Sequence, residues 1–225
     1  NNDNYVQIED LNSLAYPNYD DVIKYDYHYA IENVQLPITT SRGCVRRCSF
    51  CDIHAFWKKY TYRSGENIAG EMISHYEKYG VRDFFFTDSL INGNLKSFRQ
   101  LCDWLVKYYE ENNLPDRFFS WGGQWIVRTE KHLSPDDYKK AAKSGMNGLA
   151  MGVESLSEQI RIDMNKGFKN EDIDYTLEQF RLYGINCYFL MIVGYPTEKE
   201  EHHLETMQMF TKYQGYAIDG TIFGV

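Results

Sequence analysis

Three cysteines, Cys44, Cys48 and Cys51, stand at the spacing C-x-x-x-C-x-x-C in the segment TSRGCVRRCSFC. Thiolates are soft ligands, and three of them in one loop favour an iron–sulfur cluster or zinc. In a cubane of four irons, three cysteine ligands leave one iron without a protein ligand. That open position can bind a substrate or a cofactor.

The surroundings of the three cysteines fit this metal-binding prediction. Arg42, Arg46 and Arg47 add positive charge, which favours thiolates and offsets part of the charge of an anionic cluster. The chain has five cysteines, an odd number with three crowded into eight positions, so a disulfide framework is disfavoured. Because no secretory signal opens the chain, we expect a cytoplasmic protein with reduced thiols.

A zinc site is the competing interpretation of the same residues. Cys44, Cys48, Cys51 and His54 could together form a closed tetrahedral Cys3His shell. Such a site would belong to a non-enzymatic interaction domain that zinc stabilises. Small zinc modules depend on the metal because their own core is poor, whereas this triad lies in a chain that predicts six strands.

The elements that position the cysteine loop follow a regular pattern. Apolar segments predict strands over 36–41, 81–87, 117–123, 147–155, 185–196 and 217–224. Between them, apolar periodicity and capping residues predict helices over 65–79, 95–111, 135–144 and 171–183 and a last helix opened by Thr197 and Glu200. This alternation indicates right-handed βα crossovers and a parallel sheet.

The fold class that we expect is α/β: a partial (βα)6 TIM-like barrel, with a parallel sheet and the helices on the outside. A closed eight-stranded barrel needs about 250 residues, which this segment does not reach. A flat doubly wound sheet is the alternative. Both place the chemistry in loops after the carboxyl ends of the strands, where the cysteine loop lies.

Composition sets the domain organisation and excludes some partners. Residues 1–35, rich in Asn, Asp and Tyr, predict a linker or N-terminal extension that connects to an upstream domain. Residues 36–225 predict the core domain, truncated within its last strand. The net charge of −8 among 225 residues disfavours nucleic acid and anionic membrane surfaces. The longest apolar run, YFLMIVG, is far shorter than the roughly 20 residues of a membrane helix.

The cysteine motif with an aromatic residue before its last cysteine, here Phe50, resembles the signature of the radical S-adenosylmethionine (SAM) enzymes. From Leu36 to Val225, the motifs DFFFTDS and MGVES, the lysine at position 166 and the motif LMIVGYPTE resemble strand-end motifs of that family in the same order. The stretch LAYPNYDDV, followed by TTSRGC, is most similar to the subgroup with a cobalamin-binding domain ahead of the barrel.

The resemblance implies a mechanism and a set of cofactors. Cys44, Cys48 and Cys51 would hold a 4Fe-4S cluster, and the amino and carboxylate groups of SAM would chelate the fourth iron. Reductive cleavage of SAM would give a 5′-deoxyadenosyl radical that abstracts hydrogen from an unknown substrate, with flavodoxin or ferredoxin as electron donor. A cobalamin-dependent methyltransferase is the first choice of reaction, and a tRNA methylthiotransferase is the alternative.

The resemblance also implies SAM-binding residues. Phe50 is expected beside the adenine. Thr87, Asp88 and Ser89 occupy the place of a Gly-Gly-Glu stretch that receives the methionyl ammonium in many members, and here the sequence departs from the family. Their hydroxyls, carboxylate and carbonyls can still accept its protons. The alternative for Asp88 is that it caps the following turn.

The remaining candidates follow the later strands. Glu154 is expected to accept hydrogen bonds from the ribose diol, although an acid at a helix start is the alternative. Lys166, or less strongly Arg128, is expected to meet the SAM carboxylate, although a lysine on a helical segment is usually solvated. Gly194 is expected to let the backbone approach the adenosyl group because it has no side chain.

Overall fold

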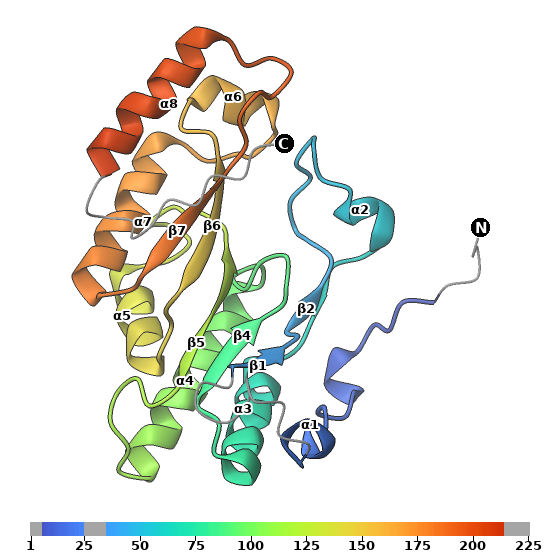
Figure 1. The fold of residues 1–225 in the computed structure, drawn as a ribbon. Helices are drawn as coiled ribbons and strands as arrows, with labels where there is room; N and C mark the ends of the chain where they lie inside the picture. Colours follow the sequence, from blue (N-terminus) through green and yellow to red (C-terminus); the bar gives the residue numbers. More distant parts are fainter. Residues whose placement is uncertain (1–5, 25–34, 214–225) are drawn as a thin grey trace.

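A computed structural model describes residues 6–24 and 35–213. Its centre is a parallel sheet of five strands in the spatial order β1, β4, β5, β6, β7 (Figure 1). These strands are β1 (Gln35–Ile38), β4 (Asp83–Phe86), β5 (Ser120–Trp125), β6 (Leu149–Glu154) and β7 (Cys187–Met191). The expected α/β fold with a parallel sheet is therefore confirmed, while the strand expected over 217–224 lies outside the described residues.

Helices follow the strands and form one layer outside the sheet. They are α3 (Gly65–Tyr79), α4 (Leu95–Glu111), α5 (Pro135–Ser144), α7 (Asn170–Tyr183) and α8 (Glu200–Tyr213). Helix α3 packs on α4, α4 on α5 and α5 on α7. The other face of the sheet carries exposed side chains such as Phe85 and Gln124. Because the helices of the described residues do not cover both faces, the arrangement is that of an open barrel and not of a doubly wound sheet.

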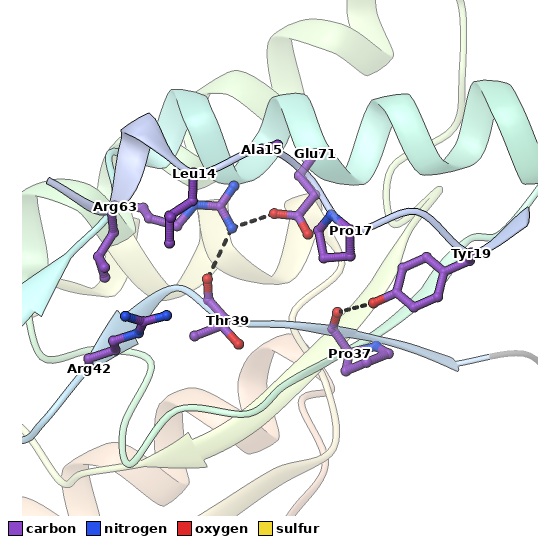
Figure 2. A pocket seen from close by; sticks show the side chains of 10 residues that line it. Leu14, Ala15, Pro17, Tyr19, Pro37, Thr39, Arg42, Arg63 and Glu71 are labelled. Atoms are coloured by element: carbon purple, nitrogen blue, oxygen red, sulfur yellow. Dashed lines mark hydrogen bonds and ion pairs between the residues drawn. The ribbon is translucent and has the colours of Figure 1, made fainter. Parts of the chain in front are cut away.

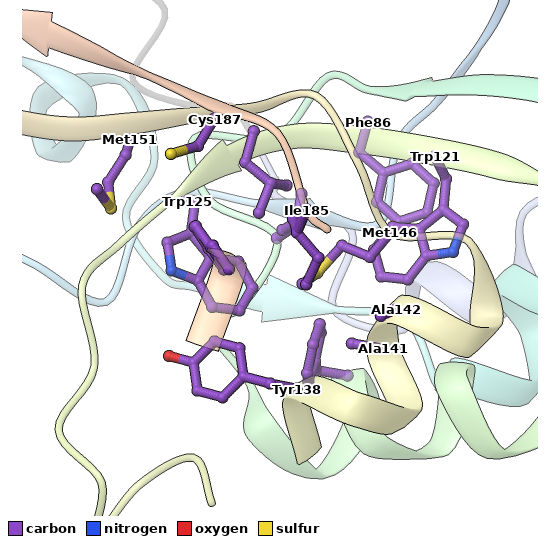
Figure 3. Packing of buried hydrophobic residues seen from close by; sticks show 14 of the residues in the cluster. Phe86, Trp121, Trp125, Tyr138, Ala141, Ala142, Met146, Met151, Ile185 and Cys187 are labelled. Carbon is purple, nitrogen blue, oxygen red and sulfur yellow. The ribbon is translucent and has the colours of Figure 1, made fainter. Parts of the chain in front are cut away.

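The core lies between the sheet and its helices. Trp121 and Trp125 have the same parity on β5 and both point outward, since alternate side chains of a strand face opposite ways (Figure 3). Phe86 of the neighbouring strand stacks on Trp121, with ring centroids 5.2 Å apart. Tyr138 of α5 lies beside Trp125, with centroids 6.1 Å apart. Cys187 is buried in the same core, so it has a packing role.

Capping residues explain where the helices begin and end. Ser134 and Asp137 form a reciprocal capping box at the start of α5, and Gly145 ends that helix in the left-handed conformation. The predicted capping box of Thr197 and Glu200 is wrong. Helix α8 begins at Glu200 itself, and the Thr197 hydroxyl instead donates to the carboxylate of Asp163.

Short elements that the sequence did not predict surround the cysteine loop. Strands β2 (Ser41–Arg42) and β3 (Thr61–Tyr62) pair antiparallel and bracket the loop, and α2 (Ile53–Phe56) follows the last cysteine. Helix α6 (Glu158–Asp163) follows β6. The predicted strands 36–41 and 185–196 are shorter in the structure, ending at Ile38 and Met191.

The described part of the N-terminal segment, residues 6–24, packs against α3 and β1. It contains a 3-10 turn (Leu11–Ser13) and α1 (Asp20–Lys24). The Tyr19 hydroxyl donates to the carbonyl of Pro37 in β1, at 3.2 Å. Figure 2 shows the pocket of about 240 Å³ beneath this segment, where Arg63 lies beside Glu71. Within the described residues, none of the helices is long and apolar enough to cross a membrane.

Candidate cofactor site

All three cysteines line one cavity of about 210 Å³ at the carboxyl ends of the strands. The cavity walls come from the cysteine loop and from the ends of β4, β5, β6 and β7, so segments far apart in sequence meet there. The lining residues are Cys44, Arg46, Cys48, Phe50, Cys51, Asp52, Ile53, Ser89, Leu90, Gln124, Trp125, Ile126, Gly152, Glu154, Lys166 and Leu190. The convergence agrees with the sequence prediction that this loop lies where the strands end.

The thiols of the cavity respond to their surroundings in a specific way. Burial raises the pKa of Cys44, and the backbone amide of Arg46, 3.4 Å from its sulfur, acts in the opposite direction. Burial also raises the pKa of Cys48, and the charge of Lys166 opposes that increase. A bound metal must therefore displace protons from these sulfurs.

The donor set fits an iron–sulfur cluster better than a single ion. Among the described residues, no three His, Cys, Asp or Glu side chains are grouped closely enough to hold one metal ion. His54, the fourth ligand of the zinc alternative, has its Nε2 in hydrogen-bond contact with the carbonyl of Arg46. A cubane places its ligands on separate irons, so its three sulfurs need not converge on a point. The Nε of Arg46 is buried and has no hydrogen-bond partner within the described part of the chain, which suits an anionic group in the cavity.

Glu154 and Lys166 form an ion pair in the lining of the cavity. The Nζ of Lys166 lies 3.0 Å from Oε1 of Glu154, and their side chains are only 7% and 13% exposed. The same Nζ lies 5.5 Å from the ring centroid of Phe50, within the range of a cation–π contact. Three residues predicted from the sequence are thus brought together, and Lys166 is not the solvated lysine of the alternative interpretation.

The backbone around Glu154 is unusual. Glu154 has φ +66°, in the left-handed region that non-glycine residues rarely adopt, next to an irregularity in the pairing of β6 with β7. A Cβ added to Gly152 would lie 3.0 Å from Oε1 of Glu154 and 3.4 Å from Nζ of Lys166. Gly152 therefore leaves the room that the ion pair needs.

Of the three residues after β4, only Ser89 lines the cavity. Asp88 is buried, and its carboxylate accepts hydrogen bonds from the backbone amides of Thr40, at 2.9 Å, and Ser41, at 2.7 Å. Burial raises the pKa of Asp88 to about 6, although these hydrogen bonds oppose the shift. The Thr87 hydroxyl lies 3.0 Å from that of Thr39. Asp88 thus caps the chain between β1 and β2, which lies well before it in the sequence, and not the following turn of the alternative drawn from the sequence.

Arg128 and Gly194 lie outside the cavity lining. Nη2 of Arg128 donates to the carbonyl of Asn92 at 2.8 Å, and burial lowers the pKa of Arg128, as does the neighbouring charge of Arg46. Gly194 has φ +82°, and its amide donates to Oε2 of Glu198 at 2.5 Å. No atom lies within 4 Å of a Cβ added there, so the backbone conformation and not a close contact favours glycine at this position.

Sequence reasoning missed Gln124, Gly152 and Leu190, which line the cavity. Gln124 lies in the central strand of the sheet, and its backbone pairs with Ala150 of β6. Its polar side chain between two buried tryptophan positions of SWGGQW was the available signal, because the alternation of a strand places it on the opposite face.

Comparisons with known proteins agree with this geometry. The profile of the Radical SAM superfamily matches residues 38–210. The bacteriochlorophyllide d C-12(1)-methyltransferase of Chlorobaculum tepidum is 25% identical over 172 residues. This match covers 74% of this chain and 35% of the methyltransferase. The cytidylyl-2-hydroxyethylphosphonate methyltransferase of Streptomyces wedmorensis is 24% identical over 183 residues, covering 79% of this chain and 32% of its own. The chain thus spans about a third of these relatives.

Solved structures share the fold. The radical SAM methyltransferase TsrM of Kitasatospora setae superposes with a TM-score of 0.75 at 19% identity, covering 88% of this chain and 37% of its own. The cobalamin-dependent radical SAM enzyme OxsB superposes with a TM-score of 0.66 at 20% identity. The match covers 84% of this chain and 28% of the OxsB chain. The expected partial barrel is thereby confirmed. With its cysteine loop, its open barrel and a profile match over most of its length, the chain belongs to the radical SAM superfamily, an enzyme family that uses a 4Fe-4S cluster and SAM.

Proposed function

We propose that this chain is the catalytic domain of a radical SAM enzyme, with the cluster held by Cys44, Cys48 and Cys51. The observation that carries the proposal is that three thiols and an ion pair, Glu154 with Lys166, line the same cavity at the strand ends. When bound and reduced, the cluster supplies the electron that cleaves SAM to a 5′-deoxyadenosyl radical for hydrogen abstraction. Flavodoxin or ferredoxin in the cytoplasm is the proposed electron donor.

The chain's own residues bind and orient the cofactors. Arg46 and Lys166 line the cavity and offset negative charge there, and Lys166 would meet the SAM carboxylate. Glu154 supplies acceptor oxygens for the ribose hydroxyls, and the Ser89 side chain can accept a proton of the methionyl ammonium. Arg128 and Thr87, outside the cavity lining, are candidates for supporting contacts.

Apolar side chains complete the binding site. Phe50 offers a ring face for the adenine, and its ring also lies close to Lys166. Leu90, Ile126 and Leu190 line the cavity and would exclude water from the reacting atoms. Gly194 and Asp88 act indirectly in this proposal: Gly194 allows the turn after β7, and Asp88 fixes the chain that leads into the cysteine loop.

Methyl transfer with cobalamin is the reaction that we propose for the whole protein. Two of the relatives above are named methyltransferases, and a structure of TsrM is described with cobalamin and a [4Fe-4S] cluster bound. Cobalamin would be bound by a domain that lies ahead of residue 1, with the segment 1–35 as its connection. Finding a domain of this kind in the upstream coding sequence would support this reaction, and its absence there would contradict it.

A methylthiotransferase is the second candidate. The ribosomal protein uS12 methylthiotransferase of Hydrogenobaculum is 27% identical over 195 residues, covering 82% of this chain and 44% of its own. A cysteine-bearing domain upstream would favour it over the cobalamin enzyme. The net charge of −8 weighs against a nucleic-acid substrate.

Anaerobic reconstitution tests the proposal. With iron and sulfide, the chain should bind about four irons and become brown. With SAM and a strong reductant, it should then form 5′-deoxyadenosine and methionine. One equivalent of zinc in a colourless protein, with no SAM binding, would contradict the proposal.

A further inference from the structure

The cysteine loop is hydrogen-bonded to the end of α6 through Ser49, the residue after Cys48. The backbone amide of Ser49 donates to the carbonyl of Met164 at 3.1 Å, and its hydroxyl donates to the carbonyl of Asp163 at 3.0 Å. These partners lie more than 110 residues further along the chain. The loop is thus attached to the far side of the barrel mouth.

A second segment, the turn after β7, joins the same contact. The hydroxyl of Tyr195 lies 2.8 Å from that of Ser49 and 3.3 Å from the carbonyl of Asp163. The Thr197 hydroxyl donates to the Asp163 carboxylate. Tyr195 therefore connects the turn that contains Gly194 with the loop that contains the cysteines.

Asn165 provides a third connection. Its Nδ2 donates to the carbonyl of Arg47 at 2.8 Å, and its φ of +57° puts it in a left-handed turn. The next residue, Lys166, reaches into the cavity and contacts Glu154 and Phe50. A shift of the cysteine loop relative to this turn would change the separation of Cys48 and Phe50 from Lys166.

We propose that Ser49, Asn165 and Tyr195 are positioning residues, and that their bonds to Asp163, Met164 and Arg47 form a clasp. This clasp holds the cysteine loop at a fixed place relative to the residues that would bind SAM. None of the three positioning residues lines the cavity, so they act through the loop and not by touching a cofactor. The functional part of this inference rests on the proposed function.

Removal of two hydroxyls tests the clasp in the metal-free chain. We would compare the wild type with Ser49→Ala, Tyr195→Phe and the double variant by hydrogen exchange and mass spectrometry. Tyr16→Phe is the matched control, because the Tyr16 hydroxyl also donates to a backbone carbonyl, that of Asn67, at 3.1 Å. Peptides covering 44–51 should exchange on the order of fivefold faster in the double variant, as expected for loss of a hydrogen bond, and at the wild-type rate in the control. Unchanged exchange in the double variant would overturn the clasp.

The reconstituted chain tests the positioning role. The double variant should bind as much iron as the wild type and release it to a chelator severalfold faster. In the reductive cleavage of SAM, its KM for SAM should increase while its kcat stays similar to that of the wild type. Faster exchange with wild-type iron release and KM would overturn the positioning role. If the wild type binds no cluster, the proposed function fails, and the exchange experiment still decides whether the clasp exists.

Discussion

Two cavities of similar size are each lined by a largely buried carboxylate paired with a cation, but they differ in how the pair is held. In the pocket beneath the N-terminal segment, Glu71 is 1% exposed and contacts both Arg63 and His75. Arg63 also donates to the carbonyl of Thr39 at 3.0 Å and to Oδ1 of Asn67 at 2.6 Å. Within the described residues, Arg63 thus has several protein acceptors, whereas Oε2 of Glu71 makes the ion pair with Arg63 and no further hydrogen bond. Glu71 lies on a regular helix.

In the cofactor cavity, Glu154 and Lys166 have fewer protein partners. Glu154 has a strained backbone, and Lys166 faces the thiols of Cys44 and Cys48. The difference teaches that burial and pairing alone do not identify a functional site. A cation that several protein acceptors hold in place stabilises the fold, whereas a pair with few other partners beside a cavity lined by thiols is available to a ligand.

The largest effect is expected where the cofactor cavity loses a proposed metal ligand. Cys48→Ala should abolish iron incorporation and SAM cleavage, because two thiols do not hold a cubane. Iron content and the visible spectrum after anaerobic reconstitution measure this. Cys187→Ala, which removes a buried thiol from the core, is the control and should retain iron. Normal iron content in Cys48→Ala would exclude Cys48 as a ligand.

The ion pair of Glu71 with Arg63 should affect the stability of the fold and not SAM binding. Glu71→Gln should lower the free energy of unfolding by roughly 3–5 kcal/mol, because it leaves the Arg63 charge buried without its partner. Denaturant unfolding of the metal-free chain measures the change, with the exposed Glu77→Gln on the same helix as control. If Glu71→Gln were as stable as the wild type but bound SAM poorly, the pocket beneath the N-terminal segment would have a role in SAM binding and not only in stability.

Asp88 lies between the two regions and should make stability depend on pH. Its pKa in the folded protein, about 6, is above the ordinary value of 3.8, so the folded state binds the proton more tightly than the unfolded state. The free energy of unfolding should therefore decrease as the pH rises from about 4 to about 6, by up to about 3 kcal/mol for this group.

Asp88→Asn should remove that part of the pH dependence. Chemical unfolding at several pH values compares the slopes, and the exposed Asp136→Asn serves as control. Equal slopes in the wild type and Asp88→Asn would show that Asp88 has no raised pKa.

The smallest effect is expected for the ion pair of Glu154 with Lys166 in the cofactor cavity. Lys166→Met keeps the length and apolar contacts of the side chain, so stability should change by less than in Glu71→Gln. SAM affinity should decrease by about tenfold, equal to about 1.4 kcal/mol, because a charge-assisted contact to the carboxylate is lost. Equilibrium binding to the reconstituted chain measures it, with exposed Lys139→Met as control. Unaltered affinity would remove Lys166 from the SAM site.

Features that depend on residues close together in the sequence, such as helix ends and the cysteine loop, could be predicted from the sequence. Helices α3 and α4 have the predicted bounds, because Ser64, Asn94 and Gly80 cap them through local hydrogen bonds or a left-handed turn. The cysteine loop was found by its spacing. The two-residue strands β2 and β3 were missed because so short a pairing depends on contacts between distant segments and leaves no periodic signal.

The cofactor site could be predicted only in part, for the same reason. Glu154 and Lys166 were named from motifs, but their contact requires α6 and the left-handed turn at Asn165 to fold back over β6. Asp88 was expected to face the cofactor, and its carboxylate instead turns toward the amides of Thr40 and Ser41. Which way a side chain at a strand end points depends on the unpaired amides around it, which a single sequence does not display.

Under the role proposed for Glu154 in binding SAM, its left-handed backbone implies a conflict between folding and cofactor binding. Glycine would adopt φ +66° without the steric strain of a side chain, which is of order 1–3 kcal/mol for a residue such as glutamate. In a library of random codons at this position, selection for thermal tolerance alone should enrich glycine, whereas selection for turnover should keep the acid. Divergence between the two enriched populations would reveal how much folding energy this enzyme gives up for its chemistry.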